Sequence, residues 1–277
     1  MERGTVLTTG ANSGIGLATV IELARLGFHS IGGVRSEAKS DIVIKAAAEA
    51  GVTGHVDTVI LDVTDADACA SVIETLPPLS GLVNNAGFGL TGAVEDVSDE
   101  EAHQLFETMV HAPIRLARLA LPAMVGNGGG RIVNVSSIAG RTTSPLAGHY
   151  TAAKHALEAL SDALRIEVAS RGVHVALVEP GGFKTNIWED MEADISRREA
   201  AGSRFVTAYR RSMSGQRVLE RLMGDPTQCA KVIATALTTR LPRARYLVGA
   251  DARALLLADT FTPTAIKDFF LRRSLDL

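Results

Sequence analysis

The sequence is poor in cysteine, in aromatic residues and in long apolar runs. Its 277 residues include two cysteines, Cys69 and Cys229, and aromatic side chains make up 4% of the chain. Two cysteines without a Cys-x-x-Cys pair provide neither a disulfide framework nor a metal-ligand motif, which favours a reduced, cytoplasmic setting. No apolar run reaches the roughly 18 residues of a membrane span, and the first residues lack the apolar segment of a signal peptide.

An excess of charge of either sign is also missing. The formal net charge is −3, which gives no basic footprint for nucleic acid or for an anionic membrane. Hydrophobic residues at 46% and charged residues at 21% are ordinary for a soluble globular protein. The chain is long enough to bury a sizeable core and shows no repeat or linker, so we expect a single domain over residues 1–277.

What the sequence does contain is a regular alternation of short β-rich runs with amphipathic helical stretches. Strands are expected at residues 5–9, 29–34, 56–61, 81–83, 131–136, 173–178 and 245–248. This alternation predicts an α/β fold with a doubly wound, Rossmann-like parallel sheet and helices on both faces. Ligands bind such sheets beyond the carboxyl ends of the strands, where Gly10, Asp62, Asn85, Ser137 and Pro180 fall.

A glycine-rich turn follows the first expected strand. Its sequence is Thr9-Gly10-Ala11-Asn12-Ser13-Gly14-Ile15-Gly16, and an amphipathic helix begins within it. A strand, a glycine turn and a helix together bring free N–H groups and the positive end of the helix dipole to one point, which suits a phosphate. The glycine spacing differs from G-x-G-x-x-G, and tight packing alone is the alternative explanation.

Arg35 directly follows the second expected strand, and no Asp or Glu occurs there before Glu37. In dinucleotide folds a carboxylate at this place binds the ribose of NAD, whereas an arginine accommodates the 2′-phosphate of NADP. A solvated arginine is the alternative. Within a nucleotide site we favour the phosphate role, and therefore NADP over NAD.

Tyr150 and Lys154 stand four residues apart in a stretch typical of a helix that continues to about Ser170. On a helix they share one face, with Cβ atoms roughly 5–6 Å apart. A cation about 4 Å from the phenol would contribute roughly 4 kcal/mol and lower the tyrosine pKa, normally about 10, by up to three units. Such a tyrosine can exchange a proton with an alcohol or carbonyl oxygen. A helical pair without a function is the alternative.

Two further stretches stand out. Residues 98–124 predict a long helix that starts with a capping box at Ser98 and is broken or kinked at Pro113. Residues 183–225 interrupt the strand–helix rhythm with apolar side chains among many charges. That pattern predicts short amphipathic helices that form a substrate lid over the active end of the sheet. The apolar residues in question are Trp188, Met191, Ile195, Phe205, Tyr209 and Met213.

Taken together, these motifs resemble the short-chain dehydrogenase/reductase family over essentially the whole chain. The motifs that occur in the family's order are Thr9-Gly10-x-x-x-Gly14-Ile15-Gly16, Asn84-Asn85-Ala86-Gly87, Ser137, Tyr150-x-x-x-Lys154 and Pro180-Gly181. The segment around Arg35, the run Ala86-Gly87-Phe88-Gly89 and the tail Arg245-Tyr246-Leu247-Val248-Gly249 further resemble the 17β-hydroxysteroid dehydrogenase-like branch.

The resemblance implies roles for individual residues. Tyr150 would exchange the proton, Ser137 would hold the reacting oxygen, and Lys154 would lower the tyrosine pKa and bind the nicotinamide ribose. The implied cofactor-binding residues are Gly10, Asn12, Ser13, Gly14, Ile15, Gly16, Arg35, Asp62, Val63, Asn85, Ala86, Gly87, Tyr150, Lys154, Pro180, Gly181 and Thr185, without a metal. Family members commonly pair through the helices that correspond to 98–124 and 149–170, which implies a homodimer or homotetramer. Small residues at helical spacing there are Ala117, Ala120, Ala156, Ala159 and Ala163.

One position departs from the family pattern. Members commonly carry an Asn in the long helix, where this chain has Met109 in the run Met109-Val110-His111-Ala112-Pro113. Methionine cannot offer an amide, which puts the usual water relay to Lys154 in doubt. The backbone carbonyl of Met109 could preserve the relay, or His111 could compensate.

The leading hypothesis is an NADP-dependent oxidoreductase that interconverts an alcohol and a carbonyl on a small apolar substrate, such as a steroid, retinoid or lipid. The competing hypothesis is a nucleotide-binding regulator with little turnover, against which the intact Ser137, Tyr150 and Lys154 speak. An epimerase or dehydratase acting on nucleotide sugars would need a larger substrate domain and a different glycine spacing.

Overall fold

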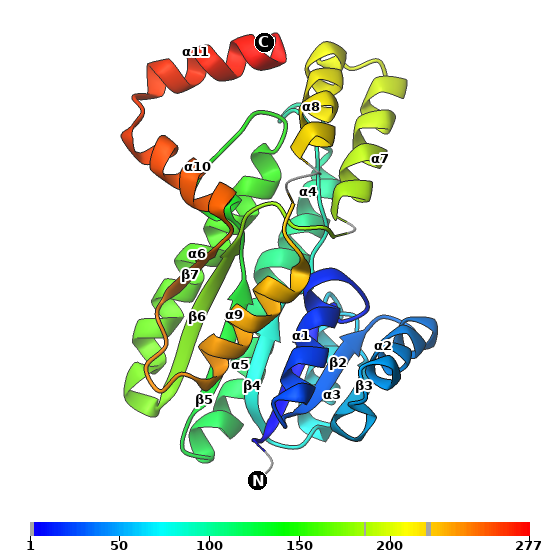
Figure 1. The fold of residues 1–277 in the computed structure, drawn as a ribbon, viewed down its shortest axis with the longest axis vertical. Coiled ribbons are helices and arrows are strands. Elements are labelled where there is room, and N and C mark those ends of the chain that lie inside the picture. Colours follow the sequence, from blue (N-terminus) through cyan, green and yellow to red (C-terminus); the bar gives the residue numbers. More distant parts are fainter. Residues whose placement is uncertain (1–2, 186, 220–222) are drawn as a thin grey trace.

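Seven parallel strands form one sheet in the order β3-β2-β1-β4-β5-β6-β7 (Figure 1). The computed structural model describes residues 3–185, 187–219 and 223–277. The strands are β1 (Thr5–Thr9), β2 (His29–Val34), β3 (Val56–Ile60), β4 (Leu79–Asn84), β5 (Gly130–Val135), β6 (Val173–Pro180) and β7 (Arg245–Val248). The strand order reverses between β1 and β4, and such a reversal opens the crevice in which doubly wound sheets bind ligands. The expected fold class is confirmed.

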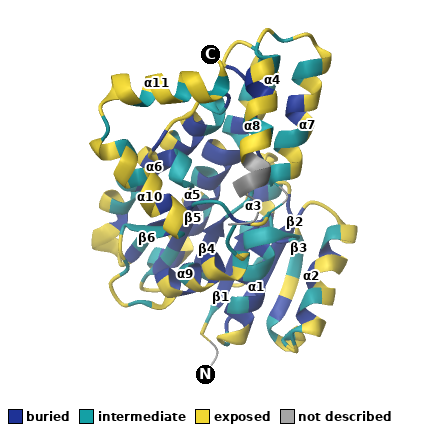
Figure 2. Cartoon of the chain, turned by 45° about the horizontal axis from the view of Figure 1, so that its top comes forward, coloured by how far each residue is buried: buried dark blue, intermediate teal, exposed yellow. Residues whose placement is uncertain are grey.

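Helices cover both faces of the sheet. On one face lie α1 (Gly14–Arg25), α2 (Glu37–Glu49) and α9 (Pro226–Thr238). On the other lie α3 (Ala66–Thr75), α5 (Ala112–Gly126) and α6 (Gly148–Val168), and α4 (Asp99–Phe106) precedes α5 beyond the sheet. Short turns of 3₁₀ helix occur at Thr53–His55, Ile138–Gly140 and Ala169–Arg171. Figure 2 shows the sheet as the most buried layer.

The side chains of each central strand alternate between the two helical layers. Val6 packs with Val83 and Ile233 on the α1 and α9 side. Its neighbour Leu7 packs with Leu82 and Ala117 on the α5 side. Because successive side chains point to opposite faces and both faces are covered, the strands read as continuous apolar runs rather than alternating ones.

The long helix expected over 98–124 is divided by a π-helical turn at Glu107–His111, which separates α4 from α5. Ser98 and Glu101 form the capping box that begins α4. Pro113 lies at the start of α5, so its missing N–H falls in the first turn, where no partner is needed. The break expected at this proline is therefore a π turn directly before it.

Different side chains hold the end of β3 and the start of α3. Asp65 is the residue that caps α3, accepting hydrogen bonds from the backbone N–H groups of Asp67 and Ala68. Thr64 instead bonds Asp62 through both its backbone N–H, at 3.0 Å, and its hydroxyl, at 2.7 Å. The threonine thereby holds a side chain at the end of β3 rather than the helix start.

Four helices lie beyond the carboxyl ends of the strands, and we call them the outer helices: α7 (Ile187–Ala200), α8 (Val206–Leu219), α10 (Ala250–Phe261) and α11 (Thr264–Leu275). The first two fulfil the expectation of amphipathic helices in 183–225, of which residues 186 and 220–222 lie outside the described part. Arg211 of α8 pairs with Asp276 at 3.4 Å, so α11 closes back towards α8.

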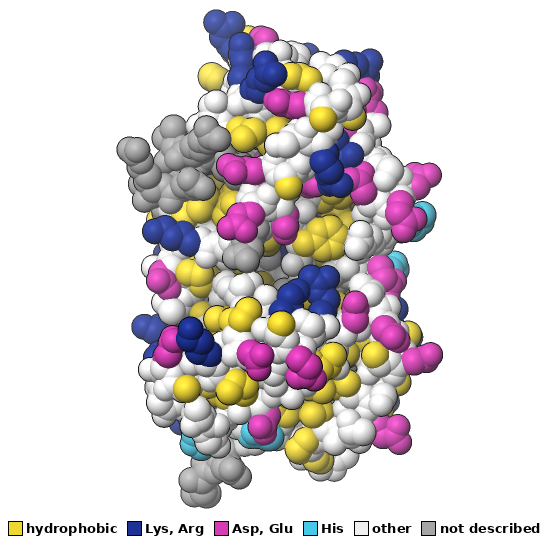
Figure 3. Space-filling model, turned by 90° about the vertical axis from the view of Figure 1, so that its right-hand side faces the viewer, with side chains coloured by type: hydrophobic (Ala, Val, Ile, Leu, Met, Phe, Trp, Pro, Cys, Tyr) yellow, Lys and Arg dark blue, Asp and Glu magenta, His cyan; other side chains and the backbone are white. Residues whose placement is uncertain are grey.

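The surface carries a balanced distribution of charge on the side that Figure 3 presents, with acidic and basic side chains interspersed. No helix within residues 3–185, 187–219 and 223–277 is both long enough and apolar enough to cross a bilayer.

Candidate active site

A cavity of about 1470 Å³ lies beyond the carboxyl ends of the strands, between the sheet and the outer helices. Every residue expected in the site lines it, with the exception of Gly16. The expected residues that it brings together are Gly10, Asn12, Ser13, Gly14, Ile15, Arg35, Asp62, Val63, Asn85, Ala86, Gly87, Ser137, Tyr150, Lys154, Pro180, Gly181 and Thr185. Segments far apart in the chain thus meet around one space large enough for a dinucleotide and a second molecule.

The turn between β1 and α1 forms a cradle at one end of this cavity. Gly10 and Gly14 have φ angles of 64° and 52°, which side chains rarely tolerate. Ser13 stands at the N-cap of α1 without a side-chain capping bond, so its side chain leaves the first N–H groups of the helix unpaired. Free N–H groups at a helix start fit the phosphates of a dinucleotide.

Gly16 serves packing rather than the cavity, and its expected contact with the cofactor is not supported. A Cβ at this position would lie 2.2 Å from the carbonyl oxygen of Gly10 and 2.5 Å from the amide nitrogen of Asn85. That amide donates to the carbonyls of Thr9, at 3.0 Å, and Gly10, at 3.2 Å. Asn85 therefore braces the glycine turn from behind, and only glycine leaves room for the brace.

A pair of cations and a carboxylate lie where β2 and β3 end. Arg35, Lys39 and Asp62 all line the cavity. Hydrogen bonds from Thr64 lower the pKa of Asp62, and the positive charges of Arg35 and Lys39 act in the same direction. The sequence analysis did not identify Lys39. Its position four residues after Arg35, in the first turn of α2, was the available signal.

Ser137, Tyr150 and Lys154 meet on the wall of the cavity nearest the middle of the sheet. Ser137 follows β5, accepts a hydrogen bond from the N–H of Ala139 at 3.1 Å, and bonds the Tyr150 hydroxyl. The Lys154 ammonium donates to the carbonyl oxygen of Val135 at 3.0 Å and lies 5.9 Å from the centre of the tyrosine ring. The helix α6 and the end of β5 therefore bring the hydroxyl, the phenol and the ammonium together.

The pKa expected for Tyr150 is wrong for this structure. Burial raises the pKa of the phenol to about 12, and the hydrogen bond from Ser137 only partly opposes it. Burial likewise lowers the pKa of Lys154 to about 8. Helical spacing brings a cation close to the phenol, but burial removes solvent from both groups and disfavours both charged forms.

Met109 lies in the π turn and is 1% exposed, packed with Leu90, Leu105 and Ala153. Its terminal methyl group occupies the space beside Gly87, where a Cβ would lie 2.8 Å away. His111, proposed as a substitute for the missing amide, is exposed and does not line the cavity. That compensation is therefore excluded by position.

The outer helices form the other wall of the cavity. Trp188 and Met191 of α7 line it, while Ile195 and Tyr209 pack into a separate apolar cluster of these helices. Additional lining residues that the sequence did not reveal come from α10 and α11, among them Leu255, Ala258, Phe270 and Leu271. The outer helices thus bring mainly apolar side chains to the cavity, together with charged ones such as Asp190, Arg197 and Lys267.

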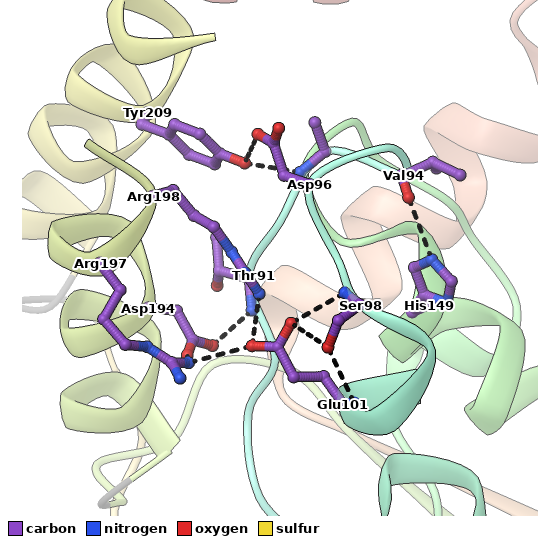
Figure 4. A network of polar contacts seen from close by, with 11 residues as sticks. Thr91, Val94, Asp96, Ser98, Glu101, His149, Asp194, Arg197, Arg198 and Tyr209 are labelled. Carbon is purple, nitrogen blue, oxygen red and sulfur yellow. Dashed lines mark hydrogen bonds and ion pairs between the residues drawn. The ribbon is translucent and has the colours of Figure 1, made fainter. Parts of the chain in front are cut away.

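A polar network attaches α7 and α8 to α4 and to the segment before it (Figure 4). Asp194 of α7 accepts a hydrogen bond from the N–H of Thr91 at 2.8 Å. Arg198 of the same helix donates to Glu101 at 2.7 Å. Tyr209 of α8 donates to Asp96 and accepts from the N–H of Ala93, both at 2.7 Å. These bonds fix the two helices over the cavity.

Known proteins are similar to this chain over most of its length. Residues 4–196, more than half of the chain, match the family model for short chain dehydrogenase. The chain is 34% identical to the uncharacterized oxidoreductase YusZ of Bacillus subtilis strain 168, over 99% of both chains. It is 31% identical to 17-beta-hydroxysteroid dehydrogenase type 6 of Rattus norvegicus, over 96% of this chain and 87% of that protein.

Solved structures are similar over the same extent. A short-chain dehydrogenase from Streptomyces avermitilis superposes with a TM-score of 0.76 at 29% identity, covering 99% of this chain and 97% of that one. A metagenomic short-chain oxidoreductase in complex with NADP gives a TM-score of 0.70 at 25% identity, covering 90% and 97%. The fold and the site thus define an NAD(P)-dependent oxidoreductase. The chain belongs to the short-chain dehydrogenase/reductase family.

Proposed function

We propose that this protein interconverts an alcohol and a carbonyl on an apolar substrate, with NADP as cofactor and Tyr150 as the acid/base. The observation that carries the proposal is the position of Ser137, Tyr150 and Lys154 in one cavity, which the phosphate cradle and mainly apolar side chains of the outer helices also line. When bound, the nicotinamide group supplies or accepts the hydride, and the chain's own residues handle the oxygen and its proton.

Carbonyl reduction is the direction for which the protonation states suit this site. The substrate oxygen would accept hydrogen bonds from the Ser137 and Tyr150 hydroxyls, and the phenol would give its proton to that oxygen. A raised pKa keeps the phenol protonated at neutral pH. Lys154, with a pKa of about 8, is mainly protonated under the same conditions and carries a proton that can replace the one given away.

The preference for NADP rests on Arg35 and Lys39, two cations at the end of the cavity that would receive the adenosine half of the cofactor. Together they offer charged hydrogen bonds to a 2′-phosphate. The NADP in the metagenomic relative supports this choice.

The apolar substrate is supported by apolar side chains that the outer helices contribute to the cavity lining, including Trp188, Met191, Leu255 and Leu271. Relatives named for steroid and retinol substrates include 17-beta-hydroxysteroid dehydrogenase type 6 and retinol dehydrogenase 5 of Mus musculus, which is 30% identical. We propose that α7 and α8 act as a lid over this substrate. A panel of keto-steroids, retinoids and small ketones, followed by the loss of NADPH absorbance, would identify the class.

The decisive variant is Tyr150→Phe. It keeps the packed ring and removes only the oxygen that exchanges the proton, so turnover should fall by at least about 10²-fold while NADPH affinity stays near that of the wild type. Lys154→Ala should lower both the turnover and the NADPH affinity, because the ammonium acts on the cofactor as well as on the phenol. A Tyr150→Phe enzyme that reduces the substrate at wild-type speed would refute the assignment. If the wild type binds NADPH but reduces no member of the panel, the regulator hypothesis is favoured.

A further inference from the structure

A buried carboxylate lies directly behind the lysine of the site. Glu158 follows Lys154 by one turn of α6, and the two residues are 4% and 6% exposed. Residues four apart on a helix are neighbours on one face. A second carboxylate, Glu179 on β6, is 1% exposed, and neither of these glutamates lines the cavity. The mechanism proposed above gives no role to either of them.

Arginines from separate elements hold the two glutamates. Arg245 of β7 contacts Glu158 at 2.9 Å, Glu179 at 3.2 Å and Asp162 at 2.6 Å. Arg141 contacts Glu179 at 3.3 Å, and Arg165 contacts Asp162 at 3.2 Å. We call this set, with Lys154, the ion cluster: Arg141, Lys154, Glu158, Asp162, Arg165, Glu179 and Arg245.

The carboxylates of the ion cluster lie among positive charges. Its four basic side chains face three acidic ones, and a nearby positive charge favours the ionised form of a carboxyl group. The pKa of Glu158 is raised, because burial and the neighbouring Glu179 outweigh the opposing effects of Ser136 and Arg245. Arg245 is close enough to Glu158 for a charged hydrogen bond.

Besides Glu158, the Lys154 ammonium is stabilised only weakly, by the face of the Tyr150 ring 5.9 Å away and by one neutral hydrogen-bond acceptor. Its direct partner is the neutral carbonyl oxygen of Val135, and Met109 offers no polar group from the π turn. Among the residues that the structure describes, Lys154 has no carboxylate in direct ion-pair contact, so Glu158 acts on it across one helical turn. In a poorly solvated environment the attraction between charges at such a distance remains substantial.

We propose that Glu158 is a positioning residue whose negative charge keeps the buried Lys154 ammonium protonated and so sets the upper pH limit of NADPH binding and turnover. This inference rests on the function proposed above, in which the lysine contacts the cofactor. Glu158 touches neither the cofactor nor the substrate and acts through Lys154.

The direction of the effect follows from the two opposing influences on Lys154. Burial lowers its pKa to about 8, and the charge of Glu158 acts against that fall. The protonated lysine is therefore present below about pH 8 and is lost above it. Without the charge of Glu158, the pKa of Lys154 would fall further, and the protonated form would be lost nearer to neutral pH.

The test is the pH dependence of NADPH affinity, measured by fluorescence titration between pH 6 and pH 10 and therefore independent of turnover. In the wild type, affinity should decline above about pH 8, and Lys154→Met should abolish that decline. Glu158→Gln should move the midpoint of the decline down by about one pH unit or more, since one charge near a poorly solvated cation has an effect of that size.

Two variants separate the charge of Glu158 from its structural contacts. Asp162→Asn removes another carboxylate partner of Arg245, at a position one helical turn further from Lys154. In this variant the midpoint of the decline in NADPH affinity should match that of the wild type. Glu158→Asp keeps the charge on the same helix face and should restore most of the shift. Glu158→Gln should fold, because Arg245 retains Asp162 and Glu179, and thermal unfolding checks this.

Each result has one reading. A lowered midpoint in Glu158→Gln, with Asp162→Asn and Glu158→Asp near the wild type, supports the proposal. An unchanged midpoint in folded Glu158→Gln overturns it and leaves Glu158 as an anchor of β7. The proposal is also overturned if the midpoint in Glu158→Asp or in Asp162→Asn falls as far as is expected for Glu158→Gln. The result with Glu158→Asp decides the matter even where Glu158→Gln does not fold. If the wild type shows no turnover but its NADPH affinity depends on pH as expected, the proposed reaction is contradicted and the proposed role of Glu158 is not.

Discussion

Arg35 and Lys39 are the residues on which the choice between NADP and NAD depends. Arg35→Ala should weaken NADPH binding by about 10- to 150-fold, since a hydrogen bond to a charged group contributes about 1.5–3 kcal/mol. NADH carries no 2′-phosphate, so its affinity should change little. Titration of both cofactors against the wild type and the variant measures the difference.

Arg25→Ala is the matched control, because this exposed arginine ends α1 and does not line the cavity. It should leave both affinities unchanged. Equal affinities of the wild type for NADPH and NADH would contradict the predicted preference.

At the scale of elements, the π turn at Glu107–His111 offers a test of proton supply. Met109→Asn would restore the amide that family members commonly carry. If that amide limits the proton supply to Lys154, turnover should rise while NADPH affinity stays constant. The variant also buries a polar group in an apolar cluster, which should cost about 1–3 kcal/mol of stability.

Turnover and thermal unfolding of Met109→Asn should therefore move in opposite directions. Met109→Leu, which keeps the cluster apolar, is the control and should change neither by much. A Met109→Asn enzyme with unchanged turnover would indicate that the proton reaches Lys154 by a route that does not need the amide.

The attachment of α7 and α8 yields a second prediction at this scale. Tyr209 is fully buried, and its hydroxyl satisfies both Asp96 and the N–H of Ala93. Tyr209→Phe leaves the N–H of Ala93 unpaired and removes one of the two hydroxyl donors to Asp96, the other being Ser203. This loss should cost about 1–3 kcal/mol. Hydrogen exchange in α7 and α8 should accelerate, and the KM for the carbonyl substrate should rise more than kcat falls.

Ser214→Ala on the same helix is the control for this variant, because its exposed hydroxyl bonds only a backbone carbonyl of its own helix. It should leave exchange rates and KM unchanged. Slow exchange and an unaltered KM in Tyr209→Phe would show that this polar network does not hold the lid.

At the scale of the whole molecule, only some of the small residues that the sequence indicated are free to take part in the predicted self-association. Ala117 and Ala120 are each 1% exposed and pack against the sheet, so they cannot pair subunits. Ala159 and Ala163 of α6 are exposed, together with Leu160 and Ile166. The outward face of α6 is therefore the surface on which we base the prediction.

The wild type should sediment as a dimer or tetramer at micromolar concentration, and Ile166→Asp should shift it towards the monomer, because a charge would replace a 68% exposed apolar side chain at the interface. The same substitution at Leu257, which is 60% exposed on α10, should leave the assembly intact. A wild-type monomer under these conditions would refute the prediction.

The sequence by itself determined the features that depend on local spacing. Alternating strand and helix patterns specify a parallel sheet, and the carboxyl ends of its strands locate the cavity. The spacing of Tyr150 and Lys154 places them on one helix face because four residues make about one turn. Glycines at Gly10 and Gly14 indicate the turn that their φ angles require. These inferences needed no knowledge of distant contacts.

Only the tertiary structure decided the properties that depend on burial and on segments far apart in the chain. The pKa of Tyr150 rises because packing removes water from the phenol, and a sequence contains no measure of that loss. α10 and α11 reach the cavity because β7 ends beside it. Arg245 meets Glu158 across 87 residues of chain because β7 pairs with β6 beneath α6. Charge and solvent exposure at a site are sums over neighbours in space, and the fold alone determines which neighbours those are.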